Sequence, residues 1–314
     1  MSTETLQAEM KGTAAQPAPA APCAAKPKKR KAVGKIIGYT ILIIYCLFLF
    51  LPMYTILATS FTSQFQLTST MSFVWWPEFT IQPYIDVFEQ DPYAWSNGIS
   101  SFALGFLNTL WITLIPLVVG LIVSGLSAYS FSKLEFPGKE KLFVVEVFMS
   151  MIPLGAFGII SYIFYSMIGW TGTVLPLIVP GLFGSVGTMF FLRMYFDGVP
   201  KQIFEAARID GLGQFGCFFR MMIPLAVPAF VAQFIFGFVG GYNSYMGPLL
   251  YLNGQDEYIT LQLFLSRVST VFTGTGMENV HCAAAVLGML PLIIIYCFSQ
   301  KLFINGIAVG GGKE

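Results

Sequence analysis

The chain has 314 residues, of which 55% are hydrophobic and only 11% are charged, with a formal net charge of +1. Its mean hydropathy of +0.71 means more apolar surface than a soluble core of this length can hide, which excludes an ordinary soluble domain. The five cysteines contain no CxxC pair, so they offer neither a disulfide framework nor a metal site. We therefore expect an all-α polytopic membrane protein, because helices satisfy their own backbone in lipid.

The chain begins with a segment rich in Ala, Pro and Lys, residues 1–31, which has too few apolar residues to fold and is predicted to be a disordered cytoplasmic tail. A first transmembrane helix is predicted at 32–60, because its apolar run exceeds the roughly 7 to 15 residues of a cleavable signal. Residues 61–101 are predicted to form an extracytoplasmic loop. The Trp and Tyr residues of this loop fit either an interfacial aromatic belt or a docking surface for an external partner.

Six apolar stretches approach or exceed the roughly 20 residues that a membrane-spanning helix needs. They lie at about 36–59, 102–131, 142–167, 174–195, 224–250 and 281–303. Residues 102–303 are thus predicted to form a core transmembrane domain, followed by a Gly-rich cytoplasmic tail at 304–314. Small residues such as Gly120, Ser124 and Gly125 predict close helix packing in the second stretch.

The basic residues predict the orientation. If both termini are cytoplasmic, 16 of the 17 Lys and Arg residues fall inside and only Arg267 falls outside, as the positive-inside rule requires. Glu146 is the acidic residue that lies within an apolar stretch, near its cytoplasmic end. There it can reach the interface or an ion-pair partner, or it can serve transport.

The longest cytoplasmic connection within the core, 199–224, is predicted to hold two short helices. Pro200 and Gly211 bracket the first helix, since Pro favours a helix start and Gly accepts a left-handed cap. On it, Ile203, Ala206, Ala207 and Asp210 are predicted to share one side, with the alanines leaving room for another protein. Glu205 and Arg208 are spaced to pair. A second helix is predicted at about 213–222.

This connection resembles the EAA loop of permease subunits of binding-protein-dependent ABC importers. The resemblance rests on Glu205, Ala206, Ala207, Asp210, Gly211, Met221, Ile223 and Pro224. Three further features resemble the maltose-permease-like, carbohydrate-uptake branch. They are Asn108 with Thr109, the run of Ala128, Tyr129 and Phe131 before Phe136, Pro137 and Gly138, and the glycine-rich ending. Many relatives carry a Trp, an Asn and an acidic residue in the fifth span. This chain has Gly241, Tyr242, Asn243 and Ser244 there, so that only the Asn is kept.

The resemblance implies a type I ABC importer permease fold in a bacterial plasma membrane. It implies a second permease, an external solute-binding protein and two ATPase subunits, which use ATP and Mg²⁺ while this chain binds no cofactor and is no enzyme. It also implies a sugar substrate, contact with lipid and no nucleic acid. The ATPase-coupling residues implied are Glu205, Ala206, Ala207, Arg208, Asp210 and Gly211. The implied contacts with the binding protein, in the outer loop 251–280, are Asn253, Gly254, Asp256, Glu257, Thr273 and Gly274.

A sugar path needs aromatic faces and amide or hydroxyl partners. The candidates are Asn108, Tyr162, Tyr165, Tyr242, Asn243 and Tyr245. Each can instead hold helices together through interhelical hydrogen bonds.

Two other classes of function are open from the residues alone. An ion-coupled secondary transporter needs ionisable groups in the membrane, for which Glu146 is a weak candidate. A membrane enzyme needs a nucleophile and base or a metal cluster, and His281, the one histidine, stands alone in the sequence. The chain contains no G-x-x-x-x-G-K-[ST] motif, so any ATP site belongs to a partner.

Overall fold

The computed structural model describes residues 28–69, 75–89, 99–152, 158–252, 254–272, 274 and 277–311. All regular elements in this part of the chain are helices. The chain divides into two units, 1–52 and 53–314, and the packing described below lies within the second. Most of the predicted tail lies outside the described residues, but helix α1 (Lys28–Ser60) begins before the predicted tail ends at residue 31. It contains the first predicted transmembrane helix.

The predicted extracytoplasmic loop 61–101 is partly helical. It contains α2 (Gln64–Ser69) and α3 (Gln82–Glu89), and α3 packs against α4 (Ser101–Lys133) and α15 (Glu278–Gly311). The Asn279 amide nitrogen donates a hydrogen bond to the Thr62 carbonyl at 2.9 Å. The described residues at Thr62 and in α3 are therefore part of the packed structure.

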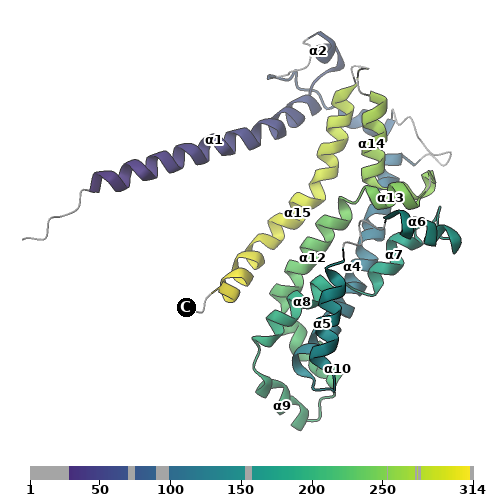
Figure 1. Ribbon diagram of the computed structural model, residues 1–314. Coiled ribbons are helices and arrows are strands. Elements are labelled where there is room, and N and C mark those ends of the chain that lie inside the picture. The colour runs from purple at the N-terminus through teal and green to yellow at the C-terminus, as the bar shows by residue number, and fades with distance from the viewer. Residues whose placement is uncertain are drawn as a thin grey trace, which may run out of the picture. The chain divides into compact units, whose positions relative to one another are not determined.

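The central helix of the second unit is α4. It packs against α7 (Leu175–Leu182), α8 (Val186–Asp197), α12 (Val227–Tyr242) and α14 (Leu261–Phe272), as Figure 1 shows. The predicted close approach is confirmed at Gly120, where an added Cβ would lie 2.2 Å from the Gly181 carbonyl oxygen. At Gly125 an added Cβ would lie 2.8 Å from the Phe230 ring.

The predicted six spans are only partly reproduced in the described residues. Four described helices are long and apolar enough to cross a membrane, and a bent pair makes a fifth. The third predicted span is divided into α5 (Lys139–Ser150) and α6 (Gly158–Met167), with 153–157 outside the described residues. The count of six therefore stays a prediction.

Three of the predicted spans are irregular. The fourth breaks between α7 and α8, where Gly184 has a φ of +83°. In the fifth, α12 meets the preceding segment Gln214–Leu225 at an 80° bend and is followed by α13 (Met246–Tyr251). The sixth is longer than predicted, because α15 runs through Gly311 and so includes most of the predicted tail 304–314. Prolines inside apolar stretches contribute to the irregularities of the fourth and fifth spans, since a proline removes a helix hydrogen bond.

Two hydrophobic clusters hold the unit together. The first joins α12, α14 and α15 through Phe238, Tyr242, Leu261, Phe264 and Ala283. The second joins the lower part of α4 and α8 to the connection 199–224. Its buried members include Tyr129, Phe196, Phe204, Phe218 and Met222.

Candidate functional site

Helix α9 (Lys201–Ile209) forms the first half of the 199–224 connection. Pro200, predicted at the first helical position, is instead its N-cap residue, and the helix begins one position later at Lys201. Gly211 follows the helix with a φ of +88°. The predicted bracketing by Pro and Gly is therefore confirmed, because a φ of this sign favours a residue without Cβ.

The faces of α9 differ from the prediction. Phe204 and Ala207 are buried, at 3% and 8% exposure, because their spacing of three residues places both against the second hydrophobic cluster. Ala207 therefore does not share an exposed side with Ala206 and Asp210, and the prediction of a surface made by both alanines was wrong. Exposed apolar surface is provided instead by Ile209, at 87% exposure.

The polar residues of α9 face outward. Glu205, Ala206, Arg208 and Asp210 are exposed. Arg208, predicted to pair with Glu205, instead donates a hydrogen bond to the Gln214 side-chain oxygen at 2.9 Å. This bond joins the two halves of the connection across the Gly211 turn. Glu205 stays exposed on the surface.

The second half of the connection is helical, as predicted, but irregular. Helix α10 (Gln214–Cys217) runs into a π-helical turn, η2 (Phe218–Met222), and then into α11 (Ile223–Leu225). Cys217, Phe218 and Met222 are fully buried. Phe218 and Met222 are four residues apart, which places both side chains on one face, against the second hydrophobic cluster.

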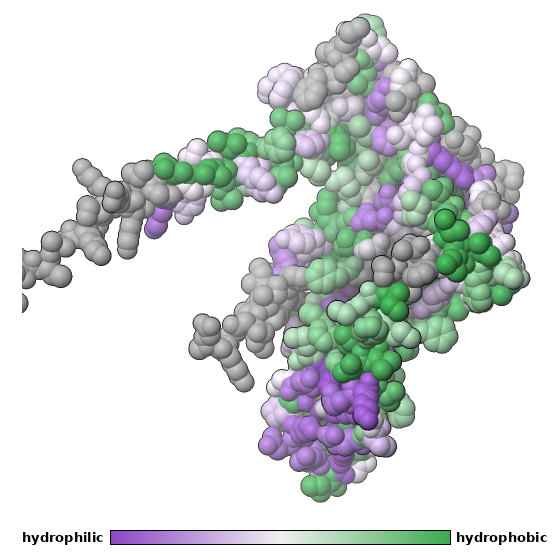
Figure 2. All heavy atoms as spheres, in the orientation of Figure 1, coloured by the Kyte–Doolittle hydropathy of each residue, from purple (hydrophilic) through white to green (hydrophobic). Residues whose placement is uncertain are grey.

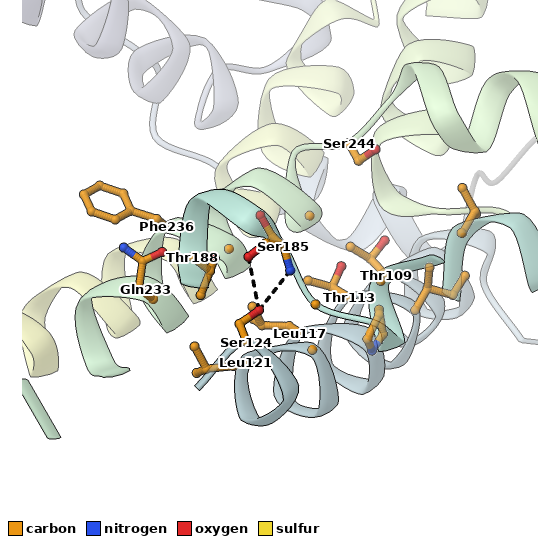
Figure 3. Close-up of a pocket in the computed structure, with 18 of the residues that line it drawn as sticks. Thr109, Thr113, Leu117, Leu121, Ser124, Ser185, Thr188, Gln233, Phe236 and Ser244 are labelled. Carbon is orange, nitrogen blue, oxygen red and sulfur yellow. Dashed lines mark hydrogen bonds between the residues drawn. The ribbon is translucent and has the colours of Figure 1, made fainter. Parts of the chain in front are cut away.

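A cavity of about 430 Å³ lies between α4, α7, α8 and α12. Figure 3 shows Thr109, Thr113 and Ser124 of α4 on one side of it, and Thr188 and Gln233 from other helices. The described residues that line it carry hydroxyl, amide or apolar side chains and no ionisable group. Such a lining matches uncharged, hydroxylated molecules better than ions.

Two serines fix the broken fourth span against the cavity wall. The Ser124 Oγ accepts a hydrogen bond from the Ser185 backbone nitrogen at 2.9 Å and lies 3.3 Å from the Ser185 carbonyl oxygen. These contacts satisfy backbone groups freed by the break, which lipid cannot do. At the other end, Thr260 lines the cavity with 3% exposure, and its buried Oγ1 has no hydrogen-bond partner among the described residues.

None of the six predicted substrate-path residues is among those that line the cavity. Asn108 donates to the carbonyls of Glu257 and Ile259, at 2.9 and 3.0 Å. The buried Tyr242 hydroxyl donates to the Gly288 carbonyl at 2.8 Å. Asn108 therefore holds α4 to the segment before α14, and Tyr242 holds α12 to α15. Both have the interhelical role that was the alternative to a substrate contact.

The other four candidates lie elsewhere. Tyr165 stacks on Trp170 and meets Tyr251 edge-on, and Tyr162 lies half-buried on the same helix, α6. Asn243 accepts a bond from Gln262, and Tyr245 accepts one from Ser266; both are exposed.

The sequence reasoning missed the hydroxyl residues of α4 that do line the cavity. Thr109 and Thr113 are four residues apart, which places them on one face of a helix. That spacing is a signal that sequence inspection can use.

The outer loop predicted at 251–280 contains a packed helix, α14. The candidate binding-protein contacts Gly254, Asp256 and Glu257 are exposed, and Asp256 pairs with Arg267. Gly274 is also exposed, and its backbone nitrogen donates to the Glu278 carboxylate at 2.8 Å. Asn253 and Thr273 lie outside the described residues.

Glu146 is half-buried in α5, and the choice between its readings stays open. The carboxylate that pairs with Arg193 across α5 and α8 is that of Glu140, at 3.2 Å.

Comparison with known proteins identifies the family. Residues 133–309 match the family described as "Binding-protein-dependent transport system inner membrane component". The chain belongs to this family. A member from Bacillus subtilis, the arabinooligosaccharides transport system permease protein AraQ, is 34% identical over 223 residues, covering 69% of this chain and 76% of the relative.

One further relative and one solved structure also resemble this chain. The diacetylchitobiose uptake system permease protein NgcG of Streptomyces coelicolor is 26% identical over 87% of both chains. A solved bacterial ABC transporter involved in the import of the acidic polysaccharide alginate matches the fold with a TM-score of 0.76 at 24% identity, covering 90% of this chain and 100% of that chain. The protein is thus a multi-pass permease with the fold of an ABC importer subunit, as the EAA resemblance predicted.

Proposed function

We propose that this protein is the permease subunit of an ATP-driven, binding-protein-dependent importer of sugars, with an oligosaccharide as substrate. The observation that carries this proposal is the cavity, which is lined by hydroxyls, an amide and apolar groups without a charged side chain among its described residues. The names of AraQ and NgcG, which specify arabinooligosaccharides and diacetylchitobiose, support an oligosaccharide.

The cavity further favours a neutral sugar. A carboxylated sugar is held by Arg or Lys, because charge-assisted hydrogen bonds are the strong ones. Thr113, Thr188 and Gln233 supply hydrogen bonds without charge, and Phe236 supplies an aromatic face. A neutral sugar can therefore bind these groups without bringing a charge that no described lining residue neutralises.

The partners in the proposal are a second permease, two ATPase subunits that use ATP and Mg²⁺, and an external solute-binding protein. The exposed face of α9, with Glu205 and Ile209, is the proposed seat of the ATPase. Gly254, Asp256, Glu257 and Gly274, together with Asn253 and Thr273 in the same stretches, are the proposed contacts of the binding protein.

The proposed setting is a bacterial plasma membrane with both termini in the cytoplasm. Figure 2 shows hydrophilic residues gathered over the end that holds α9 and α10, next to a hydrophobic region. Basic residues of this end, such as Lys201 and Arg208, are exposed. They support a cytoplasmic placement under the positive-inside rule.

The test is sugar uptake by the full complex in proteoliposomes. We expect uptake that requires ATP and the loaded binding protein and is unaffected by a proton uncoupler. Uptake that persists without ATP but stops with the uncoupler would instead establish an ion-coupled transporter. Competition by neutral and carboxylated oligosaccharides of equal length then tests the neutral preference.

A further inference from the structure

The C-terminal end of α4 contacts the turn between α8 and α9 at three successive places. Ser132 donates to the Asp197 carboxylate at 2.6 Å, and Lys133 donates to the Val199 carbonyl at 2.6 Å. After the end of the helix, Glu135 accepts from Lys201 at 2.8 Å, and this bond lowers the pKa of the Glu135 carboxyl below its usual value. We call the Ser132 and Lys133 contacts the α4 clamp.

Lys133 is the charged residue of the clamp. It is only 8% exposed, and its ammonium lies 5.7 Å from the centroid of the Phe204 ring on α9, within cation–π range. A lysine at a helix C-terminus ordinarily serves the last carbonyls of its own helix. Lys133 instead donates to a carbonyl 66 residues away in the sequence. Because this bond provides a partner for the buried charge, it fixes the start of α9 relative to the end of α4.

The same helix also lines the cavity. Ser124 of α4 lines its wall, and Lys133 lies nine positions further along, about 14 Å at the rise of an α-helix. No proline lies in α4 between these two residues, since its internal proline is Pro116. A displacement of α9 that keeps the clamp closed therefore displaces the cavity wall.

Two covalent routes also join α9 to the cavity. The chain before α9 leads through Gly198 into α8, which lines the cavity as α4 does. The chain after α9 leads into α12 and is interrupted. It passes through the π-helical turn at Phe218–Met222 and the 80° bend before Val227. Each interruption is a place where motion can be absorbed. The clamp has no such interruption.

From these contacts we propose that the α4 clamp transmits movement of α9 to the cavity and that Lys133 is a positioning residue for transport. The inference rests on the proposed function. It adds a transmission contact within this chain, on the buried side of α9, outside the exposed face proposed for the ATPase and outside the cavity. Its consequence is that loss of the Lys133 donor separates ATP hydrolysis from sugar movement while leaving the ATPase bound.

The test compares Lys133→Met, Lys133→Arg and Lys141→Met in the reconstituted complex. Methionine retains much of the alkyl packing but cannot donate to Val199; arginine can still donate. Lys141 is an exposed lysine on the neighbouring helix α5 and serves as the matched control. The readouts are co-purified ATPase subunit, ATP hydrolysed and sugar imported.

With Lys133→Met we expect unchanged ATPase binding, uptake lowered about tenfold, within the usual range of coupling effects, and more ATP hydrolysed per sugar. Lys133→Arg should recover most of the uptake, and Lys141→Met should match the wild type. Uptake by Lys133→Met equal to wild type overturns the proposal. So does a parallel loss of ATPase binding and uptake, because the lysine then only shapes the docking seat.

If Lys133→Met fails to insert, Ser132→Ala decides. This variant removes the Asp197 contact with a minimal change in volume, and a smaller rise in ATP hydrolysed per sugar supports the clamp, whereas an unchanged ratio overturns it. Failure of the wild-type complex to import sugar with ATP refutes the proposed function itself. That result is distinguishable because it affects every variant and the control.

Discussion

Asn108 shows how a polar residue in a membrane-spanning helix can serve architecture. Its amide nitrogen binds the carbonyls of Glu257 and Ile259, and its oxygen accepts from the Trp111 ring nitrogen at 3.0 Å. Next to it, the Thr109 hydroxyl accepts from the Leu261 backbone nitrogen at 2.8 Å. These bonds fix the segment before α14 to the N-terminal part of α4. Asn108 thus has the role that was the alternative to a substrate contact, with protein backbone as its partner.

We expect Asn108→Leu to destabilise the protein by about 1 to 3 kcal/mol, because two carbonyls lose their donor and one sits in a buried site. The measurement is thermal unfolding of the purified protein in detergent. Asn243→Leu is the control, since Asn243 is exposed and its amide donates within its own helix, to Val239. A midpoint for Asn108→Leu equal to that of the control contradicts the structural role.

At the scale of elements, the contact between α4 and α7 decides the shape of the cavity. Gly120 faces the Gly181 and Gly184 backbone, and Gly181 faces Pro116 in return. Interhelical contact this close requires small residues on both sides. The break after α7 is then stabilised by Ser124, so the two helices and the break form one wall.

We expect Gly120→Ala to destabilise this wall by about 1 to 3 kcal/mol, because the new methyl would overlap the Gly181 carbonyl and force the helices apart. Thermal unfolding in detergent measures the loss. Gly240→Ala is a matched helical control, since an added Cβ there has no atom within 4 Å. The control should gain about 0.5 to 1 kcal/mol from reduced backbone entropy, so equal shifts in both variants would refute the packing argument.

At the scale of the whole molecule, the proposed function requires that α9 receive force from a partner. Its buried residues, Phe204 and Ala207, fix it to the second hydrophobic cluster, while Glu205 and Ile209 stay exposed. The Gly211 turn sets the direction of the segment that follows. The helix can therefore be carried as a unit with the end of α4.

We expect Glu205→Lys to leave the protein inserted but to abolish sugar uptake, because its charge would then repel a basic residue of the ATPase. Gly211→Val should act in the same direction, since valine at positive φ costs about 1 to 3 kcal/mol of strain. Uptake in proteoliposomes and co-purified ATPase are the measurements. Gln202→Lys, a change of charge at another exposed position of α9, is the control. Normal uptake by inserted Glu205→Lys would show that the coupling assignment is wrong.

The sequence by itself determined the class of protein and the helix proposed for coupling. Mean hydropathy and apolar run length are sums over residues, and the Pro200-to-Gly211 helix is a local pattern, so neither needs knowledge of neighbours. The family followed from the short motif around Glu205, Ala206 and Gly211. The orientation read from the basic residues, by contrast, stays a prediction.

Only the tertiary structure decided which side chains look inward. Helices that are apolar all round carry no periodic signal for their inner face, so the sequence left Asn108 and Tyr242 open between a substrate contact and a bond between helices, and it did not indicate Thr113, Thr188 and Gln233. The burial of Ala207, the breaks in the spans and the bond from Lys133 to Val199 depend on helices distant in sequence. Contacts of this kind arise from packing, which no single stretch of the chain encodes.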